Sequence, residues 1–566
     1  MKESLYLGNN IAIVNLSSGY CQNANELASS DGFAMFLERY LKDLAIRDIK
    51  IYSWLTGKRQ LNEMITEMVK LTKQLLVLDI DDIYSPIVDD AYKMRALYIV
   101  EDAYYYWHSK QRFSYMNVSN NSVTFDNFVD IDTKQNEAVL QLYRICSQKL
   151  QSKQNNVYRQ LQAGTNAGCM IKNYKWNTPN GYNSLKNIGF INTVLLRTPI
   201  LFKTGSVKRE GIFTEAEKNP IKEFKSESQN WFCYPCKISG LLCFVYFHKD
   251  FMANGLSLGN LFELATEEEC NGNKPDLIIL FGNQDERDCC QFYHDDKNDI
   301  WVGSVSYDRR IEYFGYLKEM ILTLHNLARL DDNALPIHGS MLRILFKDGT
   351  IKTLVLVGDS NTGKFDTIQT LKRLSASDNS DKKIEEIETI FDDMGFLYLD
   401  DNIVYGKGTE IGAFMRLSDF DKRTSYKDKE RSIIFNQNQS SSRVLLPISS
   451  YDLVNLPHKI DIILYANNYQ QKCGVERFSS YRKAKEVLVE GKRIDKDDCD
   501  ISATFMANPF GPMQKPEQSL KVMDNIFETM YRNDVYVGQI YTNHATDHKE
   551  KLDSSVEELL EILKEL

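Results

Sequence analysis

The stretch Gly358-Asp-Ser-Asn-Thr-Gly-Lys-Phe365 narrows the fold of this chain more than any other. Its spacing is that of a phosphate-binding loop, in which glycines let backbone N–H groups surround a phosphate, a lysine neutralises the phosphate oxygens, and a Ser or Thr hydroxyl holds magnesium. Gly358, Gly363 and Lys364 satisfy the pattern, whereas Phe365 stands where the hydroxyl is expected. The sequence thus predicts a nucleotide site whose magnesium ligand has been replaced.

The residues on either side of the loop predict a strand before it and a helix after it. Thr353-Leu-Val-Leu-Val357 has the composition of a buried strand. The apolar residues after the loop recur every three positions, as on one helix face: Phe365, Ile368, Leu371 and Leu374. Such a helix directs its N-terminus at an anion, so we predict nucleotide contacts along the loop and the first turn: Gly358, Asp359, Ser360, Asn361, Thr362, Gly363, Lys364, Phe365 and Asp366. The alternative is an ordinary strand-to-helix turn that happens to contain glycines.

Length and composition describe a large globular protein. A chain of 566 residues suggests about three to four ordinary domains or two large ones. Its 43% hydrophobic and 26% charged residues are typical of packed domains. The net charge of −10 argues against nucleic-acid and anionic-membrane partners, which need a basic surface. No run approaches the roughly 18 apolar residues of a spanning helix, and no secretion signal is seen, so we expect a cytoplasmic protein.

The cysteine pattern favours reduced thiols over a disulfide framework. The chain has 11 cysteines, and Cys233-Tyr-Pro-Cys236 and Cys289-Cys290 are the candidates for metal ligands. A structural zinc site needs two well-spaced ligand pairs, which adjacent cysteines rarely supply. We therefore expect buried thiols and no zinc at these positions.

The chain divides into three predicted regions of an α/β fold. Residues 1–160 repeat apolar side chains with the period of helices and are expected to form a helical N-terminal region. Residues 161–330 alternate short apolar runs with polar stretches, as in a mixed α/β domain. Residues 331–566 hold the phosphate loop among further strands and are expected to form a nucleotide-binding domain.

Individual elements can be predicted within these regions. Helices are expected over 64–78, 94–108 and 554–566, and strands over 190–196, 241–247, 277–281, 342–346, 353–357, 395–399, 402–405, 432–435 and 460–465. Polar runs at 203–228, 282–299 and 375–383 are expected to be loops. The aromatic run Ala103-Tyr-Tyr-Tyr-Trp107 is typical of a helix core, with a ligand-stacking surface as the alternative.

Two acidic pairs follow the loop and are candidates for holding a metal ion. Asp392-Asp393 ends an apolar run, which places it at a strand end facing the nucleotide and favours it as the metal site. Asp400-Asp401 lies between two predicted strands and is typical of a hairpin turn. Upstream, His338 precedes the hairpin that leads into the loop, and its position makes it as good a candidate for a ligand as for a structural residue.

In this order the motifs resemble the nucleotide-binding core shared by ATP-dependent phosphoenolpyruvate carboxykinase and HPr kinase. The order is Ile-His-Gly-Ser340, a hairpin, Gly358-Asp-Ser-x-x-Gly-Lys364 and Asp-Asp-x-Gly395. Tyr313-Phe-Gly-Tyr-Leu-Lys318 and Ser442-Arg-Val-Leu-Leu-Pro447 resemble two further carboxykinase segments. The resemblance is strongest over 307–470. The stretches 157–168 and 507–512 are similar to a bacterial carboxykinase-like branch with an added helical N-terminus.

The resemblance implies a phosphoenolpyruvate carboxykinase-like P-loop domain and a set of cofactors. ATP would be the nucleotide, with Mg²⁺ and Mn²⁺ as the metal ions. The implied metal ligands are Lys318, His338 and Asp393, and Asp392 is added to them as the other acid of the favoured pair. A lysine ligates a metal only when it is neutral, so Lys318 would need a strongly lowered pKa.

The same resemblance implies a reaction and its catalytic residues. Oxaloacetate would lose CO2 to leave an enolate, which takes the γ-phosphoryl group of ATP. Lys364 would be the phosphate lysine, and Arg443 would contact the γ-phosphate and the organic acid. Arg209, within Lys208-Arg-Glu-Gly-Ile-Phe213, is the candidate for the guanidinium that holds the substrate.

Two departures from the family pattern keep other functions open. Phe365 supplies no magnesium ligand and is expected instead to pack into the domain with the apolar helix face. The stretch Gly491–Cys499 lacks the family's active-site loop, and the overlapping stretch Asp495 to Asp500 is acidic. The alternatives are a catalytically inactive nucleotide-binding or regulatory descendant, and a kinase of the HPr kinase type with Asp393 as base. A homo-oligomer or protein partner bound through the helical N-terminal region is also left open.

Overall fold

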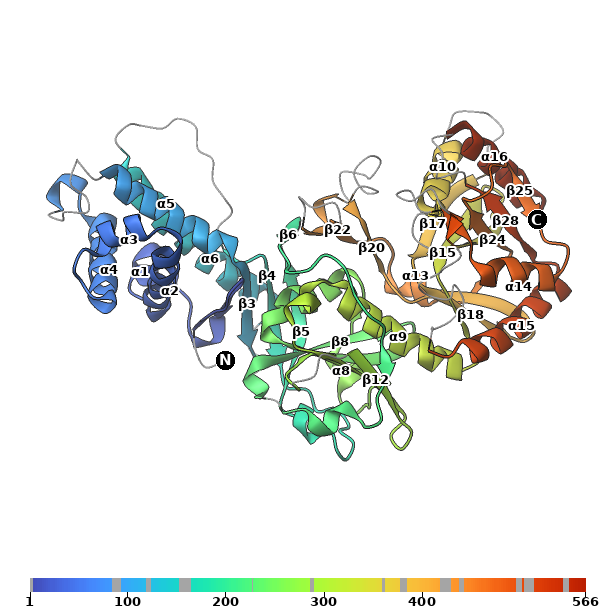
Figure 1. Cartoon of the computed structure of the whole chain (residues 1–566), viewed down its shortest axis with the longest axis horizontal. Helices are drawn as coiled ribbons and strands as arrows, with labels where there is room; N and C mark the ends of the chain where they lie inside the picture. Colours follow the sequence, from blue (N-terminus) through green and yellow to red (C-terminus); the bar gives the residue numbers. More distant parts are fainter. Residues whose placement is uncertain are drawn as a thin grey trace.

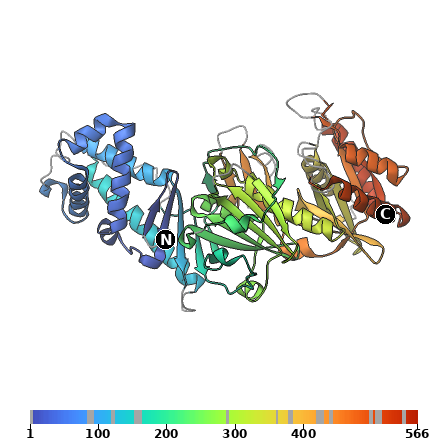
Figure 2. The same ribbon diagram turned by 60° about the horizontal axis from the view of Figure 1, so that its bottom comes forward.

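The computed structural model describes a mixed α/β protein over residues 4–83, 93–118, 124–151, 164–225, 227–285, 290–358, 362–376, 384–417, 429–436, 442–494, 501–502, 514–542 and 549–566. The molecule is elongated, with N-terminal helices at one end, a large sheet in the middle and a second sheet at the other end (Figure 1). The same order is visible in the turned view (Figure 2). Within the described residues, no helix is both long and apolar enough to cross a lipid bilayer.

The N-terminal helices pack their apolar faces against one another. They are α1 (Ala24–Ala28), α2 (Asp31–Arg47), α3 (Ile49–Thr56), α4 (Leu61–Val77), α5 (Lys93–Ser109) and α6 (Phe125–Leu150). Helix α2 begins after Ser30, whose side chain accepts the N–H of Phe33, and its Leu41 and Leu44 are buried in the helical core. The helices predicted over 64–78 and 94–108 are confirmed as α4 and α5.

A 12-stranded sheet forms the middle of the molecule, in the order β1-β2-β3-β4-β5-β8-β9-β11-β13-β12-β7, with β10 beside β8. Its strands are β1 (Leu5–Leu7), β2 (Ile11–Asn15), β3 (Gln111–Asn117), β4 (Ala167–Lys172), β5 (Gly189–Leu196), β7 (Thr214–Glu215), β8 (Trp231–Ile238), β9 (Leu241–His248), β10 (Glu263–Leu264), β11 (Leu277–Asn283), β12 (Cys290–Asp295) and β13 (Ile300–Ser306). Strand β3 pairs in parallel with β4. The N-terminal 160 residues are therefore not purely helical, because β1, β2 and β3 extend this sheet.

The strands predicted over 190–196, 241–247 and 277–281 are confirmed as β5, β9 and β11. The expectation of a loop over 282–299 is wrong, because β12 lies within it and pairs with β13 in antiparallel fashion. Only Phe292 of β12 is buried. A strand near the edge of a sheet needs few apolar residues, so its polar composition concealed it. Strand β7, at the edge of the same sheet, lies within the run 203–228 for the same reason.

Both faces of the large sheet are covered. The helices that follow its strands are α7 (Met252–Ser257), α8 (Glu267–Cys270) and α9 (Gly315–Asp331). On one face, Leu256 of α7 and Leu317 of α9 pack against the sheet, and on the other, Trp176 and Phe244 form a second core. Cys233 and Cys236 are buried free thiols in β8.

A six-stranded sheet, in the order β17-β15-β16-β24-β28-β25, forms the core of the C-terminal part. Its strands are β15 (Gly339–Phe346), β16 (Ile351–Val357), β17 (Ile384–Asp392), β24 (Ile462–Asn467), β25 (Val475–Arg477) and β28 (Tyr536–Tyr541). Helices α10 (Lys364–Ala376) and α16 (Lys549–Glu565) pack on one face, and α14 (Tyr481–Glu490) and α15 (Pro516–Arg532) on the other. The predicted helix over 554–566 is confirmed as α16.

Two small sheets lie beside this core. The first has the order β14-β18-β19-β23, from β14 (Leu335–Ile337), β18 (Gly395–Asp400), β19 (Ile403–Gly408) and β23 (His458–Lys459). The predicted hairpin turn is confirmed there, since Asp401 and Asn402 have the positive φ angles of 47° and 61° that such turns require. The second has the order β20-β22-β21-β6, from β20 (Gly412–Arg416), β22 (Arg443–Pro447), β21 (Ile433–Phe435) and β6 (Ile200–Phe202). Because β6 comes from the middle of the chain, this sheet joins the middle and C-terminal parts.

Further short elements complete the described C-terminal part. They are α13 (Tyr451–Asn455), β26 (Arg493–Ile494) and β27 (Ile501–Ser502). Helix α9 is a second link between the two parts, because it contacts β11 and β13 of the large sheet as well as β14 and α15. Figure 1 shows it running from the middle of the molecule toward the C-terminal part. From its first turn, the side chain of Lys318 contacts Asp393 and Glu410 of the C-terminal part.

Candidate functional site

The phosphate loop lies between β16 and α10, so the predicted strand and helix around it are confirmed. Lys364 is the first residue of α10, and its Nζ donates a hydrogen bond to the carbonyl of Gly358. A Cβ added to Gly358 would lie 2.6 Å from Thr362 Oγ1, so the close turn requires glycine here. Thr542 Oγ1 donates to the Thr362 carbonyl at 2.6 Å and fixes the far side of the loop. The predicted contacts at 359–361 lie outside the described residues.

The first turn of α10 lacks the hydroxyl of a usual magnesium site. Phe365 is only partly buried, whereas Ile368 and Leu371 are fully part of the core. The expectation that Phe365 packs into the domain is thus met only in part, because its place in the first turn leaves it at the protein surface. Thr367 Oγ1 donates to the Gly363 carbonyl at 2.8 Å, so this hydroxyl is used by the helix itself.

Asp393 lies at the centre of a charged cluster beside the loop. It follows the last residue of β17 and has a φ of 108°, in the region that L residues other than Asn and Asp rarely adopt. Its backbone N–H donates to the Gly339 carbonyl at 2.9 Å, which holds the turn against β15. One carboxylate oxygen, Oδ1, lies 2.5 Å from His338 Nε2, and the other, Oδ2, lies 2.5 Å from Lys318 Nζ.

The cluster is joined directly to the phosphate loop. His338 lies between β14 and β15, and its carbonyl accepts the N–H of Gly358 at 3.1 Å. Strand β15 pairs with both β16 and β17, with Gly339 opposite Val357 and Ser340 opposite Asp392. The end of β17, the start of β15 and the end of β16 therefore meet at one edge of the sheet.

Glu410 is a member of the cluster that the sequence did not indicate. It precedes β20, it is fully buried, and its Oε1 lies 3.3 Å from Lys318 Nζ. Neither of its carboxylate oxygens has a hydrogen-bond partner among the described residues. Burial raises the pKa of Glu410 to about 8, although the ammonium of Lys318 acts in the opposite direction. The only signal in the sequence was one acidic residue in the small and apolar run Gly408-Thr-Glu-Ile-Gly412.

Electrostatics separate the two acids of the Asp392-Asp393 pair. Burial tends to raise the pKa of Asp393, but the charges of Lys318 and His338 outweigh it and hold this pKa well below its usual range. For Asp392, burial prevails and raises the pKa, while the hydroxyl of Ser340 donates a hydrogen bond to it. Asp393 is therefore the acid of the pair that is held ionised by the cluster.

Lys318 does not have the lowered pKa that metal ligation by a lysine requires. It lies in the first turn of α9 and is 4% exposed. Burial acts to lower its pKa, but the carboxylates of Asp393 and Glu410 prevail and raise it. In the described structure Lys318 is thus a charged partner of two acids, and its role as a metal ligand stays a prediction.

The two predicted arginines lie on separate elements. Arg209 Nε lies 3.3 Å from Glu319 Oε2, so Arg209 lies beside the start of α9. Arg443 begins β22 and pairs with Arg416 of β20. Its Nη1 is buried and has no hydrogen-bond partner among the described residues. Two arginines directly opposite one another repel, and an anion bound near them would reduce that cost.

The donor set can be compared with what a metal ion requires. Across the described part of the chain, no group of three or more histidine, cysteine, aspartate or glutamate side chains is arranged to hold a metal. His338 and Asp393 are in contact, and the unsatisfied oxygens of Glu410 lie on the other side of Lys318. A cation would need Lys318 to move or to lose its proton before it could reach all three.

Comparisons with known proteins add no assignment to this geometry. No protein-family model matches the chain, and a search of the curated proteins finds no match. The functional interpretation therefore depends on the motifs and on the contacts described above.

Proposed function

We propose that this chain binds a nucleoside triphosphate with a divalent cation and transfers its γ-phosphoryl group, as ATP-dependent phosphoenolpyruvate carboxykinases do. The observation that carries the proposal is the convergence of Lys318 and His338 on Asp393, beside the loop that holds Lys364. The bond from Gly358 N–H to the His338 carbonyl fixes the loop against this cluster. Phosphoryl transfer depends on positive groups and a metal held around the phosphates, and this region supplies candidates for both.

The cation would be held by His338, Asp393 and Glu410, and Lys318 would join them only after losing its proton. The buried Oε2 of Glu410 supports this role, because it has no hydrogen-bond partner among the described residues and such buried acceptors are rare unless an ion or water satisfies them. Carboxylate and imidazole groups are ligands that Mn²⁺ accepts. Bound there, the cation would stabilise negative charge on the enolate oxygen and on the γ-phosphate.

The remaining charged groups would position the reactants. In the proposed reaction, the bond to the β-carboxylate of oxaloacetate breaks to release CO2, and the resulting enolate oxygen attacks the γ-phosphorus while the bond to ADP breaks. Lys364, now bonded to the Gly358 carbonyl, would turn to the phosphate oxygens. The unpartnered Nη1 of Arg443 supports a role on the γ-phosphate, and Arg209 would hold the organic acid.

A coupled assay tests this function directly. Purified protein is mixed with phosphoenolpyruvate, bicarbonate, ADP and Mn²⁺, and ATP formation is followed. We expect turnover by the native chain and a loss of at least about 100-fold in Lys364→Ala, because the lysine neutralises charge that spreads in the transition state. Lys372→Ala is the matched control, since Lys372 lies on the same helix and donates instead to Thr389 Oγ1. Absence of turnover by well-folded native protein would contradict the proposal.

One observation favours a second function, a nucleotide-binding protein without turnover. The first turn of α10 has Phe365 in place of the magnesium hydroxyl, and Thr367 is used by the helix backbone. A chain of this kind would bind ATP and show no phosphoryl transfer in the coupled assay. Transfer of label from ATP to a protein or small-molecule hydroxyl would instead indicate a kinase of the HPr kinase type, with Asp393 as base.

A further inference from the structure

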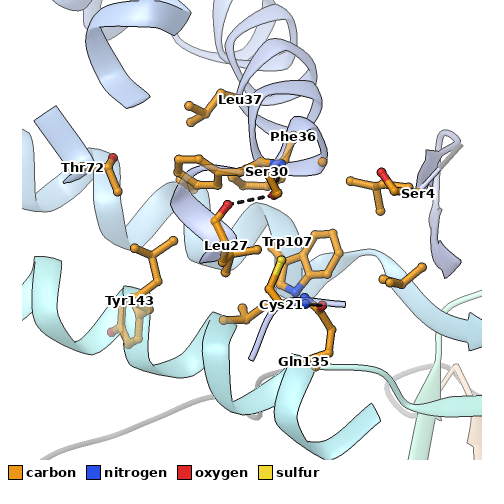
Figure 3. A pocket seen from close by; sticks show the side chains of 18 of the residues that line it. Ser4, Cys21, Leu27, Ser30, Phe36, Leu37, Thr72, Trp107, Gln135 and Tyr143 are labelled. Carbon is orange, nitrogen blue, oxygen red and sulfur yellow. Dashed lines mark hydrogen bonds between the residues drawn. The ribbon is translucent and has the colours of Figure 1, made fainter. Parts of the chain in front are cut away.

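A cavity of about 440 Å³ lies among the N-terminal helices, far along the chain from the charged cluster (Figure 3). Its walls come from α2, α4, α5 and α6, and from the residues between β2 and α1. Ligand-binding cavities in proteins commonly have about 300 to 1,000 Å³ and often lie between helices of a bundle. The cavity is therefore large enough for a small molecule.

Apolar and aromatic side chains form most of its wall. Phe36 of α2 and Trp107 of α5 meet edge to face, with ring centroids 5.9 Å apart. Tyr104 of α5 and Tyr143 of α6 stack with centroids 4.0 Å apart. All four residues line the cavity, so two aromatic pairs bound it from different helices. The aromatic run at 103–107 is thus part of a wall and not only of a closed core.

The polar groups at the wall are mostly used by the protein itself. Ser30 Oγ donates to the Leu27 carbonyl at 2.8 Å and accepts the N–H of Phe33 at 3.1 Å. Gln135 Oε1 accepts the backbone N–H of Cys21 at 2.7 Å. Figure 3 shows Cys21, Trp107 and Gln135 grouped together, so three side chains with polar atoms lie close to one another at one part of the wall.

The wall carries almost no charge. Of the residues that line the cavity in the described structure, Asp31 is the only one with a carboxylic acid, and none is a lysine, arginine or histidine. Burial raises the pKa of the Cys21 thiol and raises that of Cys146 to about 12, so both thiols stay neutral. The described wall has no cationic side chain to compensate an anion, and burying an unpaired charge is costly.

We propose that this cavity binds an uncharged small molecule with a largely apolar, acyl or aromatic body and a single polar end. The apolar body would lie between the two aromatic pairs, and the polar end would lie on the side of Cys21 and Gln135. This site is separate from the charged cluster, and ligand binding there does not depend on whether the chain transfers phosphoryl groups.

Binding of Nile red, an uncharged apolar dye, tests the site on the full chain. We expect saturable binding of one dye per chain, followed by dye emission. Displacement separates the ligand classes: 1-decanol is expected to displace the dye at a concentration at least about tenfold lower than decanoate, because only the second carries a negative charge. Equal displacement by the two compounds, or no saturable dye binding, would overturn the proposal.

Variants that fill the cavity locate the binding. Val139 of α6 lines the cavity, and Val139→Phe is expected to weaken dye binding at least about tenfold by occupying the space. Ile46→Phe is the matched control, since Ile46 lies on α2 with 87% of its surface exposed. If Val139→Phe does not fold, Ala103→Phe fills the same cavity from α5. Native-like dye binding by a folded filling variant would place the dye elsewhere and overturn the proposal.

Discussion

The charged cluster around Asp393 and the N-terminal cavity both form where several elements meet. Ion pairs hold the cluster together, whereas the packing of apolar side chains forms the cavity. In the cluster, Lys318 and His338 each contact one oxygen of the same carboxylate. In the cavity, aromatic and aliphatic side chains set the shape, and the wall in the described structure has one charged residue, Asp31. A change of charge should therefore impair the cluster and leave the cavity intact. A change of side-chain volume should impair the N-terminal region and leave the cluster intact.

The largest effect is expected from Asp393→Asn. The amide keeps the shape and tolerates the positive φ, but it removes the charge that Lys318 and His338 share. We expect manganese affinity and turnover in the coupled assay to fall at least about 100-fold, with Nile red binding unchanged.

The control for this change is Asp332→Asn. Asp332 pairs with Arg329 at the end of α9, and its side chain is 61% exposed. An exposed pair of this kind contributes about 0–1 kcal/mol to stability, so the control should behave as the native chain does. If Asp393→Asn and Asp332→Asn had the same activity, the cluster would not be the reaction site.

A smaller side chain in the helical core should destabilise the N-terminal helices and leave the charged cluster unaffected. Leu44 of α2 is fully buried in the helical core, and Leu44→Ala is expected to cost about 3 kcal/mol. Amide hydrogen exchange of α2 measures this loss locally, and manganese affinity should not change. Ile46→Ala on the same helix is the control, expected within about 0.5 kcal/mol of native. Equal exchange in the two variants would contradict the packing described here.

Helix α9 carries two buried titratable side chains whose pKa values shift in opposite directions, because charged partners outweigh burial for one and not for the other. Lys318 near its start has two acids beside it, whereas His325 is fully buried and, among the described residues, has one hydrogen-bond partner, the side-chain oxygen of Asn326 at 3.1 Å from Nδ1. Burial lowers the pKa of His325 to about 3, so the folded chain keeps it neutral.

The sign of the pH effect follows from that lowered pKa. The unfolded chain takes up the proton near pH 6.5, so stability from this group is complete above that pH and is lost as the pH falls toward 3. At pH 5 the loss is about 2 kcal/mol. The free energy of unfolding of His325→Gln, measured with urea, is expected to rise by about this amount relative to that of the native chain between pH 7.5 and pH 5. A constant difference between the two proteins across this range would contradict the assignment.

The smallest effect is expected from Phe365→Thr, which restores the usual hydroxyl in the first turn of α10. One added metal contact is expected to tighten MgATP binding by about 3- to 10-fold, or about 1 kcal/mol. Phe365→Leu, which removes the ring without adding a hydroxyl, should leave the affinity unchanged. Equal affinities of the two variants would show that this position is not beside the magnesium ion.

The comparison also shows which features a sequence can reveal. The order of His338, Lys364 and Asp393 was visible because a phosphate loop fixes spacing along the chain, and the structure brings these residues to one edge of the sheet. Glu410 was missed because its role depends on burial next to Lys318, which is 92 positions away in the chain. Local spacing predicts local structure, but it does not predict which distant acid will face a buried lysine.

The same limit applies to the strands and to the cavity. Strand β12 was missed because a strand near a sheet edge needs only one buried side chain, Phe292. The run at 103–107 has the period of a core helix, and nothing in that period distinguishes a closed core from a cavity wall. Whether Tyr104 and Trp107 meet other side chains or empty space is decided by the packing of α2 and α6.

Nucleotide binding at the phosphate loop can be measured by calorimetric titration of ATP in the presence of Mn²⁺, on the native chain and on Lys364→Ala. Lys364 is the first residue of α10 and already contacts the loop carbonyl at Gly358, so its loss should remove a main phosphate contact. We expect saturable binding of one nucleotide by the native chain and an affinity lower by at least about 100-fold in the variant. Absence of binding by folded native protein, or equal affinity of the two proteins, would contradict the proposed nucleotide site.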